Sequence, residues 1–262
     1  MSSTAQAPLV RRLAAEALGT GLLAAVVVGS GIAAARLSPA DRGLQLFENA
    51  AATAAALAVI ILLVGPVSGA HLNPLVSLAD WWLGRRDHTG LDLGEVGGYA
   101  AAQTAGGIGG TVLANLMYDL APVTWSHTDR SAGHLWLSEV VATAGLIAVV
   151  FALARSGRAA LSAATIGAYI GAAYFFTAST SFANPAITVA RAFTDTFAGI
   201  APASVPAYVI AQTVGAGLGL ATVRLLYPDL ADTAAATAVV PHDPAGPQSA
   251  ARRARARDGL PR

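Results

Sequence analysis

Long apolar segments recur along the chain, separated by short stretches in which charged residues, glycine and proline gather. A helix of about 20 apolar residues is long enough to cross the hydrocarbon core of a bilayer. The pattern therefore predicts an all-α membrane protein with six transmembrane helices, at residues 13–35, 45–66, 96–117, 135–154, 159–179 and 204–227.

The composition supports a membrane protein and excludes several kinds of site. Of the 262 residues, 55% are hydrophobic and 12% are charged, whereas soluble domains contain roughly 25% charged residues. The absence of cysteine excludes disulfides and thiolate metal sites. The five histidines show no metal-ligand spacing and no nucleophile stands beside a base, so we expect no enzyme, metal or cofactor. The net charge of +1 is uninformative about nucleic acid, but no basic-aromatic pattern supports such a partner, so we expect none.

The first apolar segment has a second interpretation. Arg11 and Arg12, the apolar stretch and the alanines at 33–35 resemble a secretory signal peptide with its cleavage site. We favour a permanent transmembrane helix, because a later segment repeats this one and Glu16 has a counterpart in Glu139.

The distribution of arginine predicts the orientation in the membrane. With the amino terminus inside, the inner side holds Arg11, Arg12, Arg85, Arg86, Arg155, Arg158 and Arg224, and the tail adds five more arginines. The outer side holds Arg36, Arg42, Arg130 and Arg191. This excess predicts a bacterial plasma-membrane protein with both termini in the cytoplasm. Residues 229–262, rich in Ala, Pro and Arg, are expected to form a disordered basic tail, with contact to lipid headgroups as the alternative.

The chain contains an internal repeat. Residues 99–118 (YAAAQTAGGIGGTVLANLMY) align without gaps to residues 208–227 (YVIAQTVGAGLGLATVRLLY), and Asn-Pro occurs in each half, at Asn73 and Asn184. Because each half has three spans, an odd number, the second half enters the membrane from the opposite side. We therefore expect one domain, residues 1–228, built from inverted halves at about 11–118 and 135–228.

The two Asn-Pro segments are too short to cross the membrane. Residues 73–83 form about 16 Å of helix, roughly half a bilayer. Proline suits the first position of a helix and asparagine suits the N-cap before it. One such pair could equally be a turn, but two copies in register with an inverted repeat predict two re-entrant half-helices that meet at the midplane.

Two meeting helix N-termini would place positive dipole ends and asparagine N–H donors at the centre of the membrane. Irregular backbone at that depth is tolerated where it is buried in protein or lines a wet cavity. We expect carbonyls of residues 69–72 and 181–183 to provide acceptors along a path that repels cations, including protons.

The motifs SGAHLNP (68–74) and FANPA (182–186), together with Glu16 and with Gln103 and Gln212, resemble the major intrinsic proteins, the aquaporins and aquaglyceroporins. The resemblance covers residues 11–228. It implies six helices, two half-helices, one pore per subunit and a homotetramer in the lipid bilayer. It also implies that Glu16 and Glu139 brace the two loops, the alternative being misplaced span ends.

The resemblance implies a pore midplane at Asn73, Pro74, Leu75, Asn184, Pro185 and Ala186. Leu75 replaces the alanine of the family pattern, and it either narrows the midplane or fills a packing gap, which we favour. The pore wall and vestibule would comprise Gly69, Ala70, His71, Leu72, Phe182, Ala183 and Arg191. His71 would either add a donor or pH sensitivity, or serve as a packing residue.

The outer filter departs most from the family. The family places an arginine three residues after the second asparagine, where this chain has Ile187. Spacing from the asparagines adds Thr53, Ala172 and Ser181, which together predict a wide filter with few donors. Arg191, one turn beyond Ile187, either restores a positive charge in the vestibule or pairs with Asp195.

The function we expect is passive conduction of small neutral hydroxylated solutes with exclusion of protons and ions. The residues around the second motif resemble a bacterial branch found beside arsenic-resistance genes, which implies arsenite-type hydroxides first, then glycerol, then water. A secondary transporter is the alternative, since inverted repeats with broken helices also build transporters. Against it, no carboxylate lies near the start of either Asn-Pro segment to bind a coupling ion.

Overall fold

The computed structural model describes residues 7–86 and 89–228. Within these residues there are six long α-helices and two short ones, without strands. The long helices are α1 Leu9–Leu37, α2 Arg42–Ser68, α4 Leu93–Met117, α5 Gly133–Arg155, α6 Ser162–Phe176 and α8 Val205–Leu226. The short helices are α3 Pro74–Gly84 and α7 Pro185–Ala190. The predicted all-α architecture of six helices and two half-helices is confirmed. The tail expected at 229–262 lies outside the described residues.

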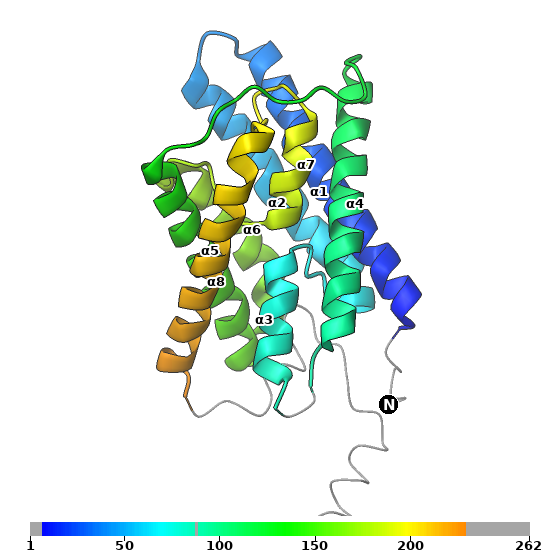
Figure 1. Cartoon of the computed structure of the whole chain (residues 1–262), viewed down its shortest axis with the longest axis vertical. Coiled ribbons are helices and arrows are strands. Elements are labelled where there is room, and N and C mark those ends of the chain that lie inside the picture. Colours follow the sequence, from blue (N-terminus) through cyan, green and yellow to red (C-terminus); the bar gives the residue numbers. More distant parts are fainter. Residues whose placement is uncertain (1–6, 87–88, 229–262) are drawn as a thin grey trace, which may run out of the picture.

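Five of the long helices are apolar and long enough to cross a membrane. The sixth, α4, has 25 residues, about 37 Å of helix, but its many glycines lower its hydropathy. It lies beside α1 along the side of the bundle (Figure 1). The large apolar side chains on the outside include Val59, Leu62, Leu137, Ile210 and Leu218, each of which is more than half exposed. A surface of this kind is suited to contact with acyl chains.

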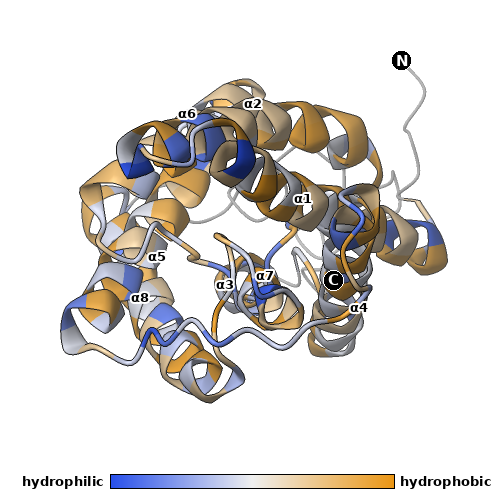
Figure 2. Ribbon diagram, turned by 90° about the horizontal axis from the view of Figure 1, so that it is seen from above, coloured by the Kyte–Doolittle hydropathy of each residue, from blue (hydrophilic) through white to orange (hydrophobic). Residues whose placement is uncertain are grey.

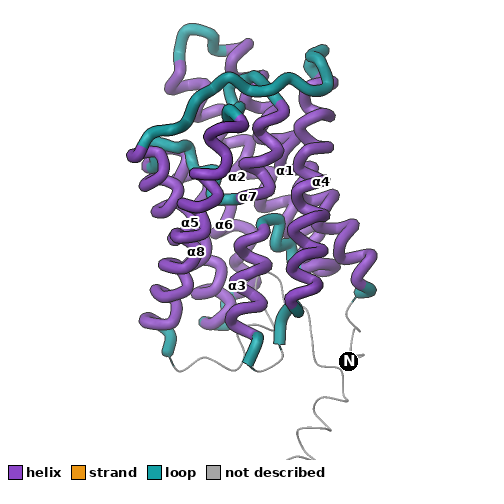
Figure 3. The backbone as a smooth tube through the Cα atoms, in the orientation of Figure 1, coloured by secondary structure: helices purple, strands orange, loops and turns teal. Residues whose placement is uncertain are grey.

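The two short helices meet in the middle of the bundle. Figure 1 shows α3 in the lower half and α7 in the upper half, and Figure 2 shows both inside the ring of long helices. We call the end that holds the start of α1 the inner end, and the opposite end the outer end. The chain between α2 and α3 rises from the inner end, and the chain between α6 and α7 descends from the outer end (Figure 3).

Glycines allow the equivalent helix pairs of the two halves to touch backbone to backbone. A Cβ at Gly106 or Gly110 of α4 would overlap the carbonyl oxygens of α1. A Cβ at Gly215 or Gly219 of α8 would overlap the carbonyl oxygens of α5 in the same way. Since lipid supplies little hydrophobic drive between helices, close van der Waals contact of this kind holds the pairs together.

A long loop covers the outer end of the bundle, between α4 and α5 (Figure 3). It is tied down by backbone hydrogen bonds: Thr124 N–H donates to Phe193 at 3.2 Å, and Ser126 N–H donates to Ala192 at 3.1 Å. These acceptors belong to the short 3-10 helix Arg191–Phe193 that continues α7. The loop is therefore fixed to the outer half-helix and helps to hold it in place.

Candidate functional site

Asn73 and Asn184 cap the two half-helices where these meet. Asn73 Oδ1 accepts from the N–H of Leu75 at 2.9 Å, and Asn184 Oδ1 accepts from the N–H of Ala186 at 3.0 Å. Because each side-chain oxygen is bonded to the first turn of its own helix, the amide nitrogen of the same side chain points away from that helix. An asparagine amide has two N–H groups, and one of each pair bonds the opposite loop, as described next.

The amides cross between the two halves. Asn73 Nδ2 donates to the carbonyl of Ala183 at 2.8 Å, and Asn184 Nδ2 donates to the carbonyl of Leu72 at 2.7 Å. Both asparagines line one central cavity and are buried. Each therefore retains a second N–H for a hydroxyl oxygen that enters the cavity.

The loop before α3 is held by one buried carboxylate. Glu16 Oε1 accepts from Ser68 Oγ at 2.6 Å and from the N–H of His71 at 3.0 Å. Its Oε2 accepts from the N–H of Leu72 and from Gln103 Nε2, each at 2.7 Å. The carboxylate thus provides acceptors for backbone that cannot form a helical ladder of its own.

The second half repeats this arrangement around Glu139. Its Oε1 accepts from Ser179 Oγ at 2.6 Å and from the N–H of Phe182 at 2.9 Å. Its Oε2 accepts from the N–H of Ala183 at 2.8 Å and from Gln212 Nε2 at 2.6 Å. Both glutamates are fully buried inside the bundle, so they hold loops and do not mark the ends of spans.

These carboxylates stabilise loops with an unfavourable backbone. Ala70 and Leu72 in the first loop have φ of 50° and 53°, and Ser181 and Ala183 in the second have 50° and 48°. The left-handed region costs a residue other than glycine about 1 kcal/mol or more. Both loops contain residues with positive φ at equivalent positions. The hydrogen bonds of the two glutamates offset the cost of this backbone and fix the conformation of both loops at the centre of the bundle.

The central cavity has a volume of about 70 Å³. Apolar side chains form most of its wall, among them Leu23, Leu57, Leu146, Val150 and Ile170. The polar side chains that line it are Thr53, His71, Asn73, Tyr174, Ser181, Asn184 and Arg191. The cavity thus combines an apolar surface with a limited set of hydrogen-bonding groups, as in sites that hold small molecules.

The expected pore residues are divided by the structure. Ala70, Leu72, Phe182 and Ile187 line the cavity with the polar residues above. The others lie around it without lining it: Gly69, Pro74, Leu75, Ala183, Pro185 and Ala186. Leu75 belongs to the hydrophobic core and is 5% exposed, which favours the packing interpretation of this departure from the family pattern.

The assignment of Ala172 to the outer filter is wrong. This residue lies on the exposed side of α6 and does not line the cavity. Tyr174, two residues further along α6, lines it instead, with its hydroxyl 3.3 Å from Thr53 Oγ1. The outer part of the pore therefore contains an aromatic ring and a hydroxyl, and it is richer in hydrogen-bonding groups than the sequence suggested.

Arg191 lines the cavity and does not pair with Asp195. Its guanidinium lies over the ring of Phe182, 3.4 Å from the centroid, and its Nε donates to the carbonyl of Ala198. Asp195 instead accepts from the N–H and the ring Nδ1 of His127, each at 2.9 Å. The ion-pair interpretation is therefore wrong, and a positive charge does stand at the outer part of the pore.

His71 has contacts that fit both interpretations of its role. Its Nδ1 lies 3.0 Å from Ser77 Oγ, and its ring packs 5.3 Å from that of Tyr99, centroid to centroid. It also lines the cavity. Ser181 is a second polar group on this wall, and its buried hydroxyl has no hydrogen-bond partner among the described residues.

Sequence reasoning missed Tyr174 and Arg130. Arg130, from the outer loop, lies 5.0 Å from the ring centroid of Phe182 and donates to the carbonyl of Gly199 at 3.0 Å. Two guanidiniums therefore contact one aromatic ring at the outer end. The one signal in the sequence for Arg130 was its positive charge in the outer loop, on the side of the membrane from which the second Asn-Pro segment enters.

Comparison with known proteins agrees with this geometry. A family model described as major intrinsic protein matches residues 3–181. The aquaglyceroporin AqpS of Rhizobium meliloti (strain 1021) is 51% identical over 218 residues, covering 83% of this chain and 91% of that protein. The glycerol uptake facilitator protein of Pseudomonas aeruginosa is 33% identical over 181 residues, covering 60% of this chain and 62% of that protein.

The fold also matches a solved structure, the X-ray structure of the aquaglyceroporin from Plasmodium falciparum. The TM-score is 0.63 at 21% identity, and the match covers 85% of this chain and 99% of that chain. With the crossed half-helices, the repeated glutamate network and a family model that matches more than half of the sequence, the chain belongs to the major intrinsic protein family.

Proposed function

We propose that this membrane channel passes small neutral hydroxylated solutes passively, and that these include arsenite-type metalloid hydroxides, glycerol and water. One observation carries the proposal: the amides of Asn73 and Asn184 face a cavity whose remaining wall is largely apolar. A solute with hydroxyl groups on one side can bond the amides while its other side contacts the apolar wall.

The electrostatics of the cavity favour neutral solutes. Two helix N-termini and Arg191 contribute positive potential, and no carboxylate stands among the described residues that line the cavity. Cations, including protons, would meet this barrier. An anion would lose its hydration against an apolar wall, which is costly without a full set of partners. A neutral solute avoids both penalties.

The choice among solutes rests on size and on the relatives. Glycerol is supported by the names of the two relatives given above, an aquaglyceroporin and a glycerol uptake facilitator. Arsenous acid presents hydroxyl groups much as glycerol does, and Ile187 leaves room where the family pattern has an arginine. We place arsenite-type hydroxides and glycerol ahead of water.

We further propose a homotetramer in the bacterial plasma membrane with both termini in the cytoplasm. The arginine asymmetry supports the orientation, because the inner ends of the helices and their loops hold seven arginines and the outer ends hold four. Light-scattering of the purified protein in detergent measures the number of subunits.

The solute proposal is tested by stopped-flow light scattering of proteoliposomes. Gradients of glycerol, of arsenite at neutral pH and of an impermeant sugar measure the three permeabilities on one preparation, with protein-free liposomes as the control. We expect faster glycerol and arsenite entry than in the control vesicles. Water flux alone, without solute entry, would contradict the proposal.

A further inference from the structure

A second cavity lies on the outside of the bundle, near the inner end, between α3 and α8. It has a volume of about 460 Å³ and is lined mainly by apolar side chains, including Leu78, Trp82, Gly217 and Leu220. None of the residues that line it also lines the central pore. Leu78 and Trp82 are 37% and 38% exposed, so this groove is open to the surroundings of the protein.

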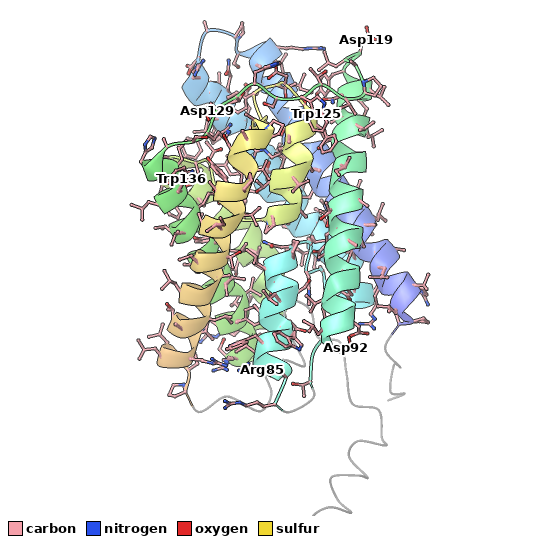
Figure 4. The ribbon with its side chains drawn as sticks, viewed as in Figure 1. Arg85, Asp92, Asp119, Trp125, Asp129 and Trp136 are labelled. Carbon is pink, nitrogen blue, oxygen red and sulfur yellow. The ribbon has the colours of Figure 1, made fainter. Side chains whose placement is uncertain are left out.

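At the inner end of the groove, two arginines lie close to the ring of Trp82: Arg224, which lines the groove, and Arg85, which stands beside it. The guanidinium of Arg85 lies 3.4 Å from the ring centroid of Trp82, and that of Arg224 lies 5.6 Å from it. Arg85 stands where α3 ends, close to α8 (Figure 4). Arg224 comes from the last turn of α8 and also lines the groove.

Neither arginine has a described acidic partner. The ion pairs within residues 7–86 and 89–228 are Arg12 with Glu95 and His127 with Asp195. Burial, together with the charges of Arg86 and Arg224, lowers the pKa of Arg85. Like charges thus converge at this end of the groove, and an anion bound there would relieve their repulsion.

We propose that the groove binds an anionic phospholipid, with an acyl chain between α3 and α8 and the phosphate between Arg85 and Arg224. Trp82 marks the level of the membrane interface, where tryptophan is enriched. Basic pockets between membrane helices are suited to anionic headgroups. The arginine-rich tail of the chain is a poorer occupant, since it would bring like charge to this end. The proposal does not depend on which solute the pore passes.

Native mass spectrometry of the full chain tests this, with phosphatidylglycerol and phosphatidylcholine of identical acyl chains as probes. We expect phosphatidylglycerol to be retained preferentially. The double change Arg85→Gln with Arg224→Gln should weaken phosphatidylglycerol binding about tenfold or more, since each arginine at a membrane surface contributes about fivefold. Arg158→Gln is the matched control, because Arg158 is exposed at the same end but lies outside the groove.

A second pair of variants tests the groove without altering charge. No atom lies within 4 Å of a Cβ built at Gly217, so the side chain of Gly217→Leu would start from open space in the groove. We expect it to reduce phosphatidylglycerol binding, whereas Gly109→Leu, at an equally open helical glycine of α4, should not. The melting temperature in detergent should be unchanged in all these variants, which would show that they fold.

Three results would overturn the proposal. Equal retention of the two lipids would show that charge is not recognised. An equal loss in Arg158→Gln would show that general surface charge attracts the lipid. A change in the number of subunits in Gly217→Leu, with lipid binding intact, would show that a second copy of the chain occupies the groove.

Discussion

Asn73 and Asn184 fix each other's loops. The amide of Asn73 donates to the carbonyl of Ala183, which directly precedes Asn184, and the amide of Asn184 donates to the carbonyl of Leu72, which directly precedes Asn73. The two halves of the chain are therefore tied together at the point where their helix N-termini meet. Any change that displaces one loop is expected to displace the other, and with it the hydrogen-bonding groups of the pore.

Replacing either bracing glutamate should damage both the fold and the flux. In Glu16→Gln or Glu139→Gln, one carboxylate oxygen becomes an NH₂ group that faces two donors. Unsatisfied buried donors of this kind cost about 2–5 kcal/mol in total. We expect a lower melting temperature in detergent and a loss of glycerol flux.

Glu48→Gln is the control for these two variants, because Glu48 accepts a single described hydrogen bond, from Ser38 Oγ, and is less buried. Its melting temperature should stay close to that of the unchanged protein. Wild-type stability and flux in both bracing variants would show that the loops do not depend on the carboxylates.

The outer constriction should respond to Tyr174 and not to Ala172. Tyr174→Ala removes a ring from the cavity wall and should raise the ratio of glycerol to water permeability severalfold. Tyr174→Phe retains the ring and should change this ratio less, by removing the contact with Thr53. Ala172→Phe adds the same ring on the exposed side of α6 and should leave both fluxes unaltered. If stopped-flow measurements show that Ala172→Phe lowers the fluxes and Tyr174→Ala leaves the ratio unchanged, the outer filter contains Ala172 and not Tyr174.

Restoring the family's arginine should narrow the choice of solute. Ile187→Arg adds a cationic group to the cavity wall, so glycerol and arsenite flux should fall more than water flux. Arg191 is held by Phe182 and by the carbonyl of Ala198, so it should not prevent this effect. The double change Ile187→Arg with Arg191→Ala checks that point by removing the neighbouring positive charge. An unchanged ratio of solute to water permeability in both variants would show that this position does not set selectivity.

The attachment of the outer loop should depend on Asp195 at low pH. Hydrogen bonds from the backbone N–H and then the side chain of His127 lower the pKa of Asp195. The pKa of an aspartate in an unfolded chain is about 3.9. A carboxyl group whose pKa is lowered in the folded protein stabilises the folded loop at pH values above about 3.9, and this stabilisation is lost as the pH falls through the lowered pKa. Between pH 5 and 8 this carboxylate should therefore remain ionised and able to accept both hydrogen bonds from His127.

Hydrogen exchange of residues 124–131 measures this attachment. Comparing the protein with Asp195→Asn at each pH removes the intrinsic pH dependence of exchange. We expect faster exchange in Asp195→Asn at pH 7 and convergence of the two proteins only once the pH falls below the lowered pKa of Asp195. Identical protection at pH 7 would show that the carboxylate does not hold the loop.

The sequence predicted the helices and the half-helices because their signals are local or repeated. Asn-Pro supplies the N-cap and the first helical residue as two adjacent residues, and the repeat indicates that both copies have equivalent roles. The misplaced filter residue has a physical cause. A transmembrane helix is apolar towards both lipid and a largely apolar pore, so α6 gives no sign of which face is inside.

Contacts between residues far apart in the chain could also not be predicted from the sequence. The helix ends at Phe176, and Thr180 to Ala183 follow a partly left-handed path, so counting back from Asn184 cannot fix the rotation of Tyr174. Asp195 pairs with His127, 68 residues away, in preference to the arginine four residues before it. Such a choice depends on how the outer loop crosses the bundle.

Initial rates of glycerol uptake into proteoliposomes distinguish a passive pore from a coupled transporter. They are measured over a range of glycerol concentrations, with and without an imposed pH gradient. A pH-sensitive dye inside the same vesicles reports proton entry. For a passive, proton-excluding pore we expect uptake that rises linearly with concentration, is independent of the pH gradient and adds no proton leak over protein-free liposomes. Uptake that saturates and follows the pH gradient, or a proton leak that scales with the amount of protein, would contradict a passive, proton-excluding pore.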